Sequence, residues 1–111
     1  MPWPSSPDPF VGLAQLSVMR AWLGEITPDI RAITVDLSGR QVTVRIFHEG
    51  DASAEFIEAS RVADTEILAD FPSSGADAIA LTTLLVRCDE PARLPVLGLP
   101  IFVRKGTHFQ P

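Results

Sequence analysis

The sequence predicts a single α+β domain whose elements follow the order α-β-β-α-β-β. Apolar residues recur at helical spacing from Phe10 to Leu23 and again from about Ser53 to Phe71. Between these stretches, apolar and polar residues alternate on either side of a turn signal at Ser38-Gly39. A chain of 111 residues, 46% of them hydrophobic, can bury one core without a disulfide or a metal.

The first helix is expected to start with Asp8 as N-cap and Pro9 at its first position, and to end at Gly24. Its two sides carry Phe10, Leu13, Ala14, Ser17 and Ala21, and Leu16, Met19 and Leu23. Because the helix is apolar nearly all round, it is either buried between layers or used in self-association. Trp22 is assigned to the core, whereas Trp3 is left free to dock on its own domain, on a partner subunit or on nothing.

A β-hairpin is the firmest prediction. Ile33, Val35 and Leu37 alternate with Thr34 and Asp36, and Val42, Val44 and Ile46 return with Thr43 and Arg45 between them. A second helix should then begin near Asp51 or Ser53 and stop at Pro72. Its buried stripe is predicted to be Phe56, Ala59, Ala63 and Ile67, with Phe71 just past the end.

Two more strands complete the prediction. Residues 78–88 are apolar on both faces, which predicts a central strand. Residues 97–105 are interrupted by Gly98 and Pro100, which indicates an edge strand or a bulge. The simplest packing is one four-stranded antiparallel sheet with both helices on one face. Its strand order is either 1-2-4-3, a permuted ferredoxin-like arrangement, or the meander 1-2-3-4.

Composition predicts the domain boundaries and the cellular compartment of the protein. Residues 1–9 hold four of the ten prolines and are interpreted as a flexible arm, 10–106 as the domain and 107–111 as a tail. The N-terminus lacks the features of a secretory signal, and no stretch reaches the ~20 apolar residues of a membrane span. The single cysteine, Cys88, excludes an intramolecular disulfide and fits a reducing cytoplasm.

Negative charge is concentrated in one window of the chain. Between Glu49 and Asp77 there are eight acids and one base, a formal charge of -7 against -5 for the whole protein. The candidate partner-binding residues are Glu49, Asp51, Glu55, Glu58 and Glu66. Such a surface steers toward a basic protein partner and repels the phosphates of nucleic acid. The alternative is that these acids are only the solvated face of a helix.

No catalytic, metal-binding or cofactor motif stands above this charge signal. The only histidines, His48 and His108, are sixty residues apart and are expected to be exposed at a strand end and in the tail. Cys88 ends an apolar strand, which predicts an inert buried thiol. We therefore predict no enzyme, no metal and no cofactor, although nothing in the sequence excludes a glycosidase-like acid pair.

Two strings carry a resemblance to a known family. Residues 23–36, LGEITPDIRAITVD, resemble the LGEITPNLRAVTV segment of a family of small acidic bacterial proteins, and residues 66–72, EILADFP, resemble that family's EVIADFP helix end. The likeness spans roughly residues 13–105 and departs from the pattern in the proline-rich arm and from Pro91 to Pro100. The family resembles immunity proteins of contact-dependent-inhibition and related polymorphic toxin loci.

The resemblance implies a protein that binds a cognate toxin. Nuclease toxins need a basic cleft for their phosphate substrate, and an inhibitor can block such a cleft with acids. Two alternatives stay open. One is a homodimer held through the first helix or an edge strand, and the other is a small hydrolase or isomerase with a cleft between sheet and helices.

Overall fold

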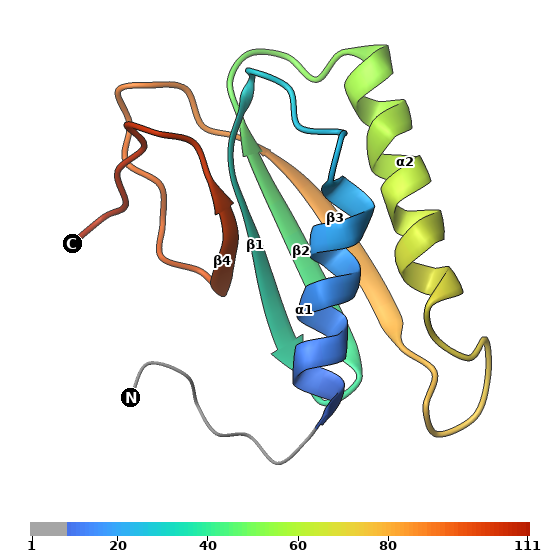
Figure 1. Cartoon of the computed structure of the whole chain (residues 1–111). Helices are drawn as coiled ribbons and strands as arrows, with labels where there is room; N and C mark the ends of the chain where they lie inside the picture. The colour runs from blue at the N-terminus through green and yellow to red at the C-terminus, as the bar shows by residue number, and fades with distance from the viewer. Residues whose placement is uncertain (1–8) are drawn as a thin grey trace.

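The computed structural model describes residues 9–111, which form one four-stranded sheet with two helices on one face (Figure 1). The elements are α1 (Pro9–Trp22), β1 (Ile30–Ser38), β2 (Gln41–His48), α2 (Ala54–Ala69), β3 (Ala80–Arg87) and β4 (Leu99–Val103). The α+β class and the order of elements are confirmed. Asp8, the predicted N-cap of α1, and most of the predicted arm lie outside the described residues.

The strand order is β3-β2-β1-β4, so both predicted orders are wrong. β1 pairs antiparallel with β2 and with β4, but β3 pairs parallel with β2 over its whole length, from Gln41↔Ala80 to His48↔Arg87. The physical reason is that α2 carries the chain back along the sheet, so the next strand starts at the same end as β2. The sheet is therefore mixed and not fully antiparallel.

The predicted central strand, residues 78–88, lies at an edge of the sheet. Its apolar residues split between two environments, because Leu81 and Leu85 pack on the core beneath the helices while Val86 and Cys88 join a second cluster on the other face. Apolarity on both faces therefore did not require strands on both sides. β4 is the other edge, as predicted, and its pairing with β1 contains a register shift.

Local signals in the sequence are mostly confirmed. Ser53 caps α2 by accepting a hydrogen bond from the Phe56 backbone amide at 3.0 Å. The hairpin turn falls at Gly39-Arg40, one residue later than predicted, with Gly39 at a φ of 57°. Gly98, at a φ of 73°, leads into β4 where an added Cβ would lie 2.7 Å from the carbonyl oxygen of Val35.

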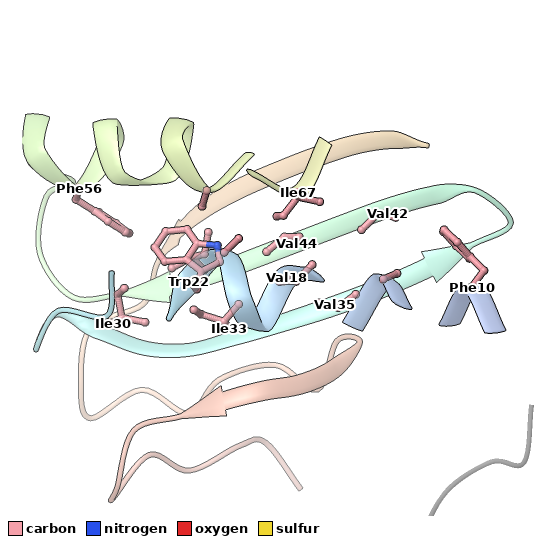
Figure 2. Close-up of a cluster of buried hydrophobic side chains, with 14 residues drawn as sticks. Phe10, Val18, Trp22, Ile30, Ile33, Val35, Val42, Val44, Phe56 and Ile67 are labelled. Carbon is pink, nitrogen blue, oxygen red and sulfur yellow. The ribbon is translucent and has the colours of Figure 1, made fainter. Parts of the chain in front are cut away.

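The main core lies between the helices and the sheet (Figure 2). Phe56, Ile67 and Val44 are buried in it together, as predicted, and Trp22 packs edge-to-face on Phe56 with the ring centroids 6.5 Å apart. The buried stripe of α2 contains Ser60 where Ala59 was predicted. The Ser60 hydroxyl donates to the Ile57 carbonyl at 2.7 Å, so its burial leaves no unpaired donor.

A smaller cluster covers the opposite face at one end of the sheet. Ala32, Phe47 and Leu94 are buried there, with Val86, Cys88 and Phe109 packed against them. Leu94 is held between backbone hydrogen bonds, donating to the carbonyl of His108 at 3.0 Å and accepting from the amide of Gln110 at 2.8 Å. The end of the chain therefore contributes to the packing of this face.

The core makes a direct prediction for α2. Ile67→Ala removes a fully buried side chain and should lower the free energy of unfolding by about 2–5 kcal/mol, because transfer and cavity costs add. Leu68→Ala is the matched control: it makes a comparable truncation one residue along at a side chain that is 47% exposed, and should change stability by less than about 0.5 kcal/mol. Urea denaturation of both variants measures the difference, and a loss below about 1 kcal/mol for Ile67→Ala contradicts the packing.

Candidate functional site

Most acids of the charged window have a cationic or polar partner. The ion pairs are Glu49–Arg104 at 2.5 Å, Asp51–Arg87 at 2.6 Å, Asp77–Arg40 at 2.8 Å, Asp70–Arg20 at 3.3 Å and Glu58–Arg61 at 3.8 Å. Asp64 accepts a hydrogen bond from the Thr83 hydroxyl, and burial raises the pKa of its carboxyl against the opposing effect of that bond. The charged window is therefore not one continuous free surface.

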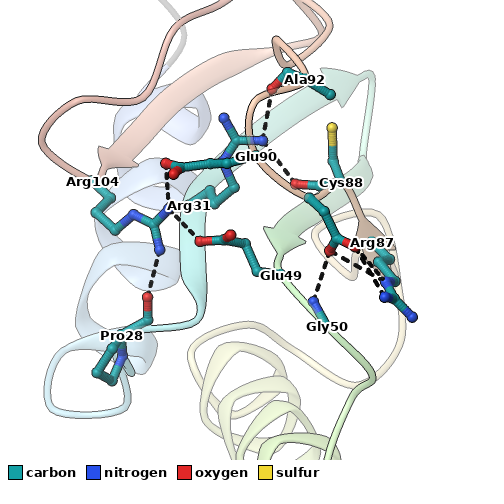
Figure 3. A network of polar contacts seen from close by, with 10 residues as sticks. Pro28, Arg31, Glu49, Gly50, Arg87, Cys88, Glu90, Ala92 and Arg104 are labelled. Carbon is teal, nitrogen blue, oxygen red and sulfur yellow. Dashed lines mark hydrogen bonds and ion pairs between the residues drawn. The ribbon is translucent and has the colours of Figure 1, made fainter.

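Glu49 belongs to a polar network centred on Arg104 (Figure 3). The Arg104 guanidinium donates to Glu49, to Glu90 at 2.8 Å and to the carbonyl of Pro28 at 2.6 Å. The Arg104 hydrogen bond is the main reason that the pKa of Glu49 lies below its usual value. The network joins the end of β2 to the loop that follows α1.

Asp51 belongs to a neighbouring network. Arg87 binds both Asp51 and Asp89, and Asp89 also accepts a hydrogen bond from the backbone amide of Gly50 at 2.8 Å. These two hydrogen bonds, that from Arg87 first, lower the pKa of Asp89. Of the predicted partner-binding residues, Glu49, Asp51 and Glu58 therefore have ion-pair partners within the fold, that of Glu58 being Arg61 on the same helix.

A groove of about 620 Å³ lies between the loop after α1 and the first turns of α2. Four carboxylates line it, those of Glu25, Asp29, Glu55 and Glu58, and no lysine or arginine does. Its remaining lining residues are Gly24, Ile26, Thr27, Ser53, Phe56, Ala59 and Val62. We call this surface the acidic groove.

Two of its acids, Glu25 and Asp29, were missed by the sequence analysis. They precede Glu49, the first acid of the charged window, by 24 and 20 residues. Within residues 9–111, neither side chain makes an ion pair, and the same holds for Glu55. A signal was present in the predicted order of elements, since the end of one helix can meet the start of the other when both cover the same face of a sheet.

Glu66 lies farther along α2, outside the acidic groove. It lines a smaller groove with Ser17, Arg20, Ala21, Ala69 and Asp70. A third groove, of about 740 Å³, contains Arg20, Arg40, Asp70 and Asp77, whose charges pair with one another. The acidic groove differs from both because its lining carries charge of one sign.

The carboxylates of the acidic groove are spread along its walls. Among residues 9–111, no group of three or more histidine, cysteine, aspartate or glutamate side chains is arranged to hold a metal ion. Separate carboxylates instead offer several positions to separate cationic groups, as on the surface of a basic protein. In the same part of the chain, neither helix has the length and apolarity needed to cross a membrane.

The prediction that His48 is exposed is wrong. Its side chain is buried, with its ring edge-to-face on Phe56 at 5.0 Å, because α2 starts directly over the end of β2. Cys88 is half-buried and packs with Phe47 and Leu94 on the opposite face of the sheet, so its thiol does not meet the His48 ring. His108 is exposed, as expected.

The Arg104 network makes a prediction about pH. Because the pKa of Glu49 is lower in the folded chain, its contribution to stability is present above the unfolded value of about 4.5 and is lost as pH falls through the folded value. Glu49→Gln should therefore destabilise the protein at pH 7 and flatten its stability profile between about pH 5 and pH 3. Glu66→Gln, at an exposed carboxylate without an ion pair among residues 9–111, is the control and should follow the wild type. Equal profiles for all three proteins in urea denaturation contradict a role for Glu49 in stability.

Comparison with known proteins adds to this geometry. Residues 14–106, most of the chain, match the family described as MafI2 immunity protein. A search of curated proteins gives no match. The matched region runs from α1 through β4 and so includes the acidic groove and the Arg104 network. Immunity proteins generally act without catalysis, and they imply a toxin as partner. The resemblance to an immunity protein is thus confirmed, and the chain belongs to the MafI2 immunity protein family.

Proposed function

We propose that this protein neutralises a cognate toxin by stoichiometric binding, and that the toxin presents a basic surface to the acidic groove and the exposed side of α2. The observation that carries the proposal is the groove itself, with four carboxylates and no cation in its lining. Membership of an immunity protein family supplies the class of partner. The residues that we assign to contact are Glu55 and Glu58, with Glu66 at the periphery.

The charge of the groove is suited to fast association. Exposed charges of one sign raise the rate at which an oppositely charged protein finds the surface, by roughly 10- to 1000-fold at low salt. A toxin that acts on phosphates carries cations in its active cleft, and carboxylates placed over that cleft compete with the substrate. Fast binding suits an inhibitor that must reach the toxin before the toxin reaches its target.

Glu49 and Asp51, although predicted as contact residues, are assigned a different part in this proposal. Glu49 binds Arg104, which in turn holds the Pro28 carbonyl in the loop that forms one wall of the acidic groove. Asp51 is paired with Arg87 just before α2 begins. Both carboxylates add to the negative electrostatic potential of this surface, but their hydrogen bonds to arginines hold the walls of the acidic groove in place.

We further propose that the protein is not an enzyme and acts in the cytoplasm within a contact-dependent-inhibition or related toxin system. The separation of His48 from Cys88, on opposite faces of the sheet, supports the first part because a nucleophile and its base must come within hydrogen-bond reach. The sole cysteine supports a reducing compartment. Binding alone accounts for the proposed activity.

Neutralising the acids tests this function. The variant Glu55→Gln, Glu58→Gln, Glu66→Gln should associate with the toxin domain encoded beside this chain about tenfold more slowly at low salt. Its rate should also vary less with ionic strength, because three of the steering charges are gone. Stopped-flow mixing at several salt concentrations gives both quantities.

A matched control changes the net charge of the protein by the same amount, but with substitutions on the face of the sheet opposite the helices. Ser38→Lys, Thr82→Lys, Leu84→Lys adds the same three units of positive charge at exposed positions opposite the helices. This control should associate at close to the wild-type rate. If both triple variants slow equally, only net charge matters and the acidic groove has no special role.

A further inference from the structure

An apolar groove lies directly beside the acidic one. It has a volume of about 150 Å³ and is lined by Met19, Trp22, Leu23, Ile26, Ile33, Ile101 and Phe102. Ile26 lines both grooves, so the loop between α1 and β1 separates an acidic surface from an apolar surface. Leu23 is 81% exposed, Met19 50% and Ile26 38%. Large apolar side chains that are clustered and exposed to water are typical of an interaction site, whereas single exposed apolar residues are common on any protein surface.

The exposed side chains are carried by an ordered loop. The amide of Leu23 donates to the carbonyl of Met19, that of Glu25 to Trp22, and that of Ile30 to Thr27, all at 3.0–3.1 Å. At the far end of the loop, Arg104 binds the Pro28 carbonyl (Figure 3). A surface already fixed in place loses less conformational entropy on binding.

The floors of the two grooves are joined through the core. Trp22 lies under the apolar groove and Phe56 under the acidic one, and their rings meet edge-to-face (Figure 2). The two grooves therefore adjoin over one packed floor, and a partner that covers the loop contacts both. Protein interfaces have this anatomy, with an apolar centre and charged residues beside it.

We propose that the loop from Leu23 to Asp29 is the centre of the toxin-docking surface, and that the toxin presents an apolar side chain next to its basic ones. The apolar side chain packs against Leu23, Met19 and Ile26, while the cations reach Glu25, Asp29, Glu55 and Glu58. This inference rests on the proposed function and extends it, since it assigns affinity to a surface outside the charged window. Charge then governs how fast the toxin arrives, and apolar burial governs how long it stays.

A second copy of this chain fits the same surface poorly. In a two-fold symmetric dimer each partner presents the same residues, so the acids of one copy face the acids and apolar side chains of the other. No lysine or arginine lines either groove, which leaves such a contact without a cation to offset the repulsion. Charge complementarity therefore selects a basic protein as the occupant.

The test is a double substitution at the loop, Leu23→Ser, Ile26→Ser, measured against the purified toxin domain encoded beside this chain. We expect the dissociation constant to rise by about tenfold or more, mainly through faster dissociation, with the salt dependence of association unchanged. Leu84→Ser is the control, because Leu84 is 42% exposed on the opposite face of the sheet, and it should bind within about twofold of wild type. The single variant Leu23→Ser guards against misfolding, since this side chain is mostly in water.

Each outcome decides between the two proposals. If wild type binds and both loop variants bind equally well, the docking surface lies elsewhere while the proposed function stands. If wild type does not bind the toxin domain, the proposed function fails and this inference fails with it. If light scattering shows a wild-type dimer that Leu23→Ser converts to monomer, a second copy covers the loop and the inference is overturned.

Discussion

The packing of Trp22 on Phe56 is the contact on which the rest of this surface depends. It joins the last turn of α1 to the first turn of α2, two places more than thirty residues apart in the chain. With that contact in place, the loop after α1 lies along the start of α2, and Glu25 and Asp29 come to face Glu55 and Glu58 across a groove. The His48 ring, at the end of β2, also packs edge-to-face against Phe56.

The acids of this chain serve two physical purposes. Those at the ends of strands, such as Glu49 and Asp89, bind arginines. The Glu49–Arg104 pair and the hydrogen bond from the Gly50 amide to Asp89 tie the C-terminal half of the chain to the residues that follow β2. Partners of this kind are expected to lower the pKa of a carboxyl, and they do so for both residues. The acids beside α2 and in the preceding loop instead face a groove without cations. Among residues 9–111, Glu25, Asp29 and Glu55 of this second group make no ion pair, whereas Glu58 pairs with Arg61 at 3.8 Å. The summed charge along the chain therefore overstated the free acidic surface.

Local features of the fold could be predicted because they depend on neighbouring residues. The alternation around Gly39 specifies the hairpin, and Ser53 specifies the start of α2. Strand order could not be predicted, since the side chains of β3 fit a parallel edge as well as a central antiparallel position. The burial of His48 and the role of Glu25 were missed for a related reason. Both follow from where α2 crosses the sheet, which is a property of the tertiary structure.

The central claim is that a basic toxin docks over the loop between α1 and β1, beside the start of α2. Amide chemical-shift mapping by NMR of this chain, titrated with a purified cognate toxin domain, tests the claim most directly. The account predicts that the largest shifts fall in residues 23–29 and 53–62, with little change on the opposite face of the sheet around Ser38 and Thr82. Shifts confined to that opposite face, or to the region of Leu94 and Phe109, would contradict it.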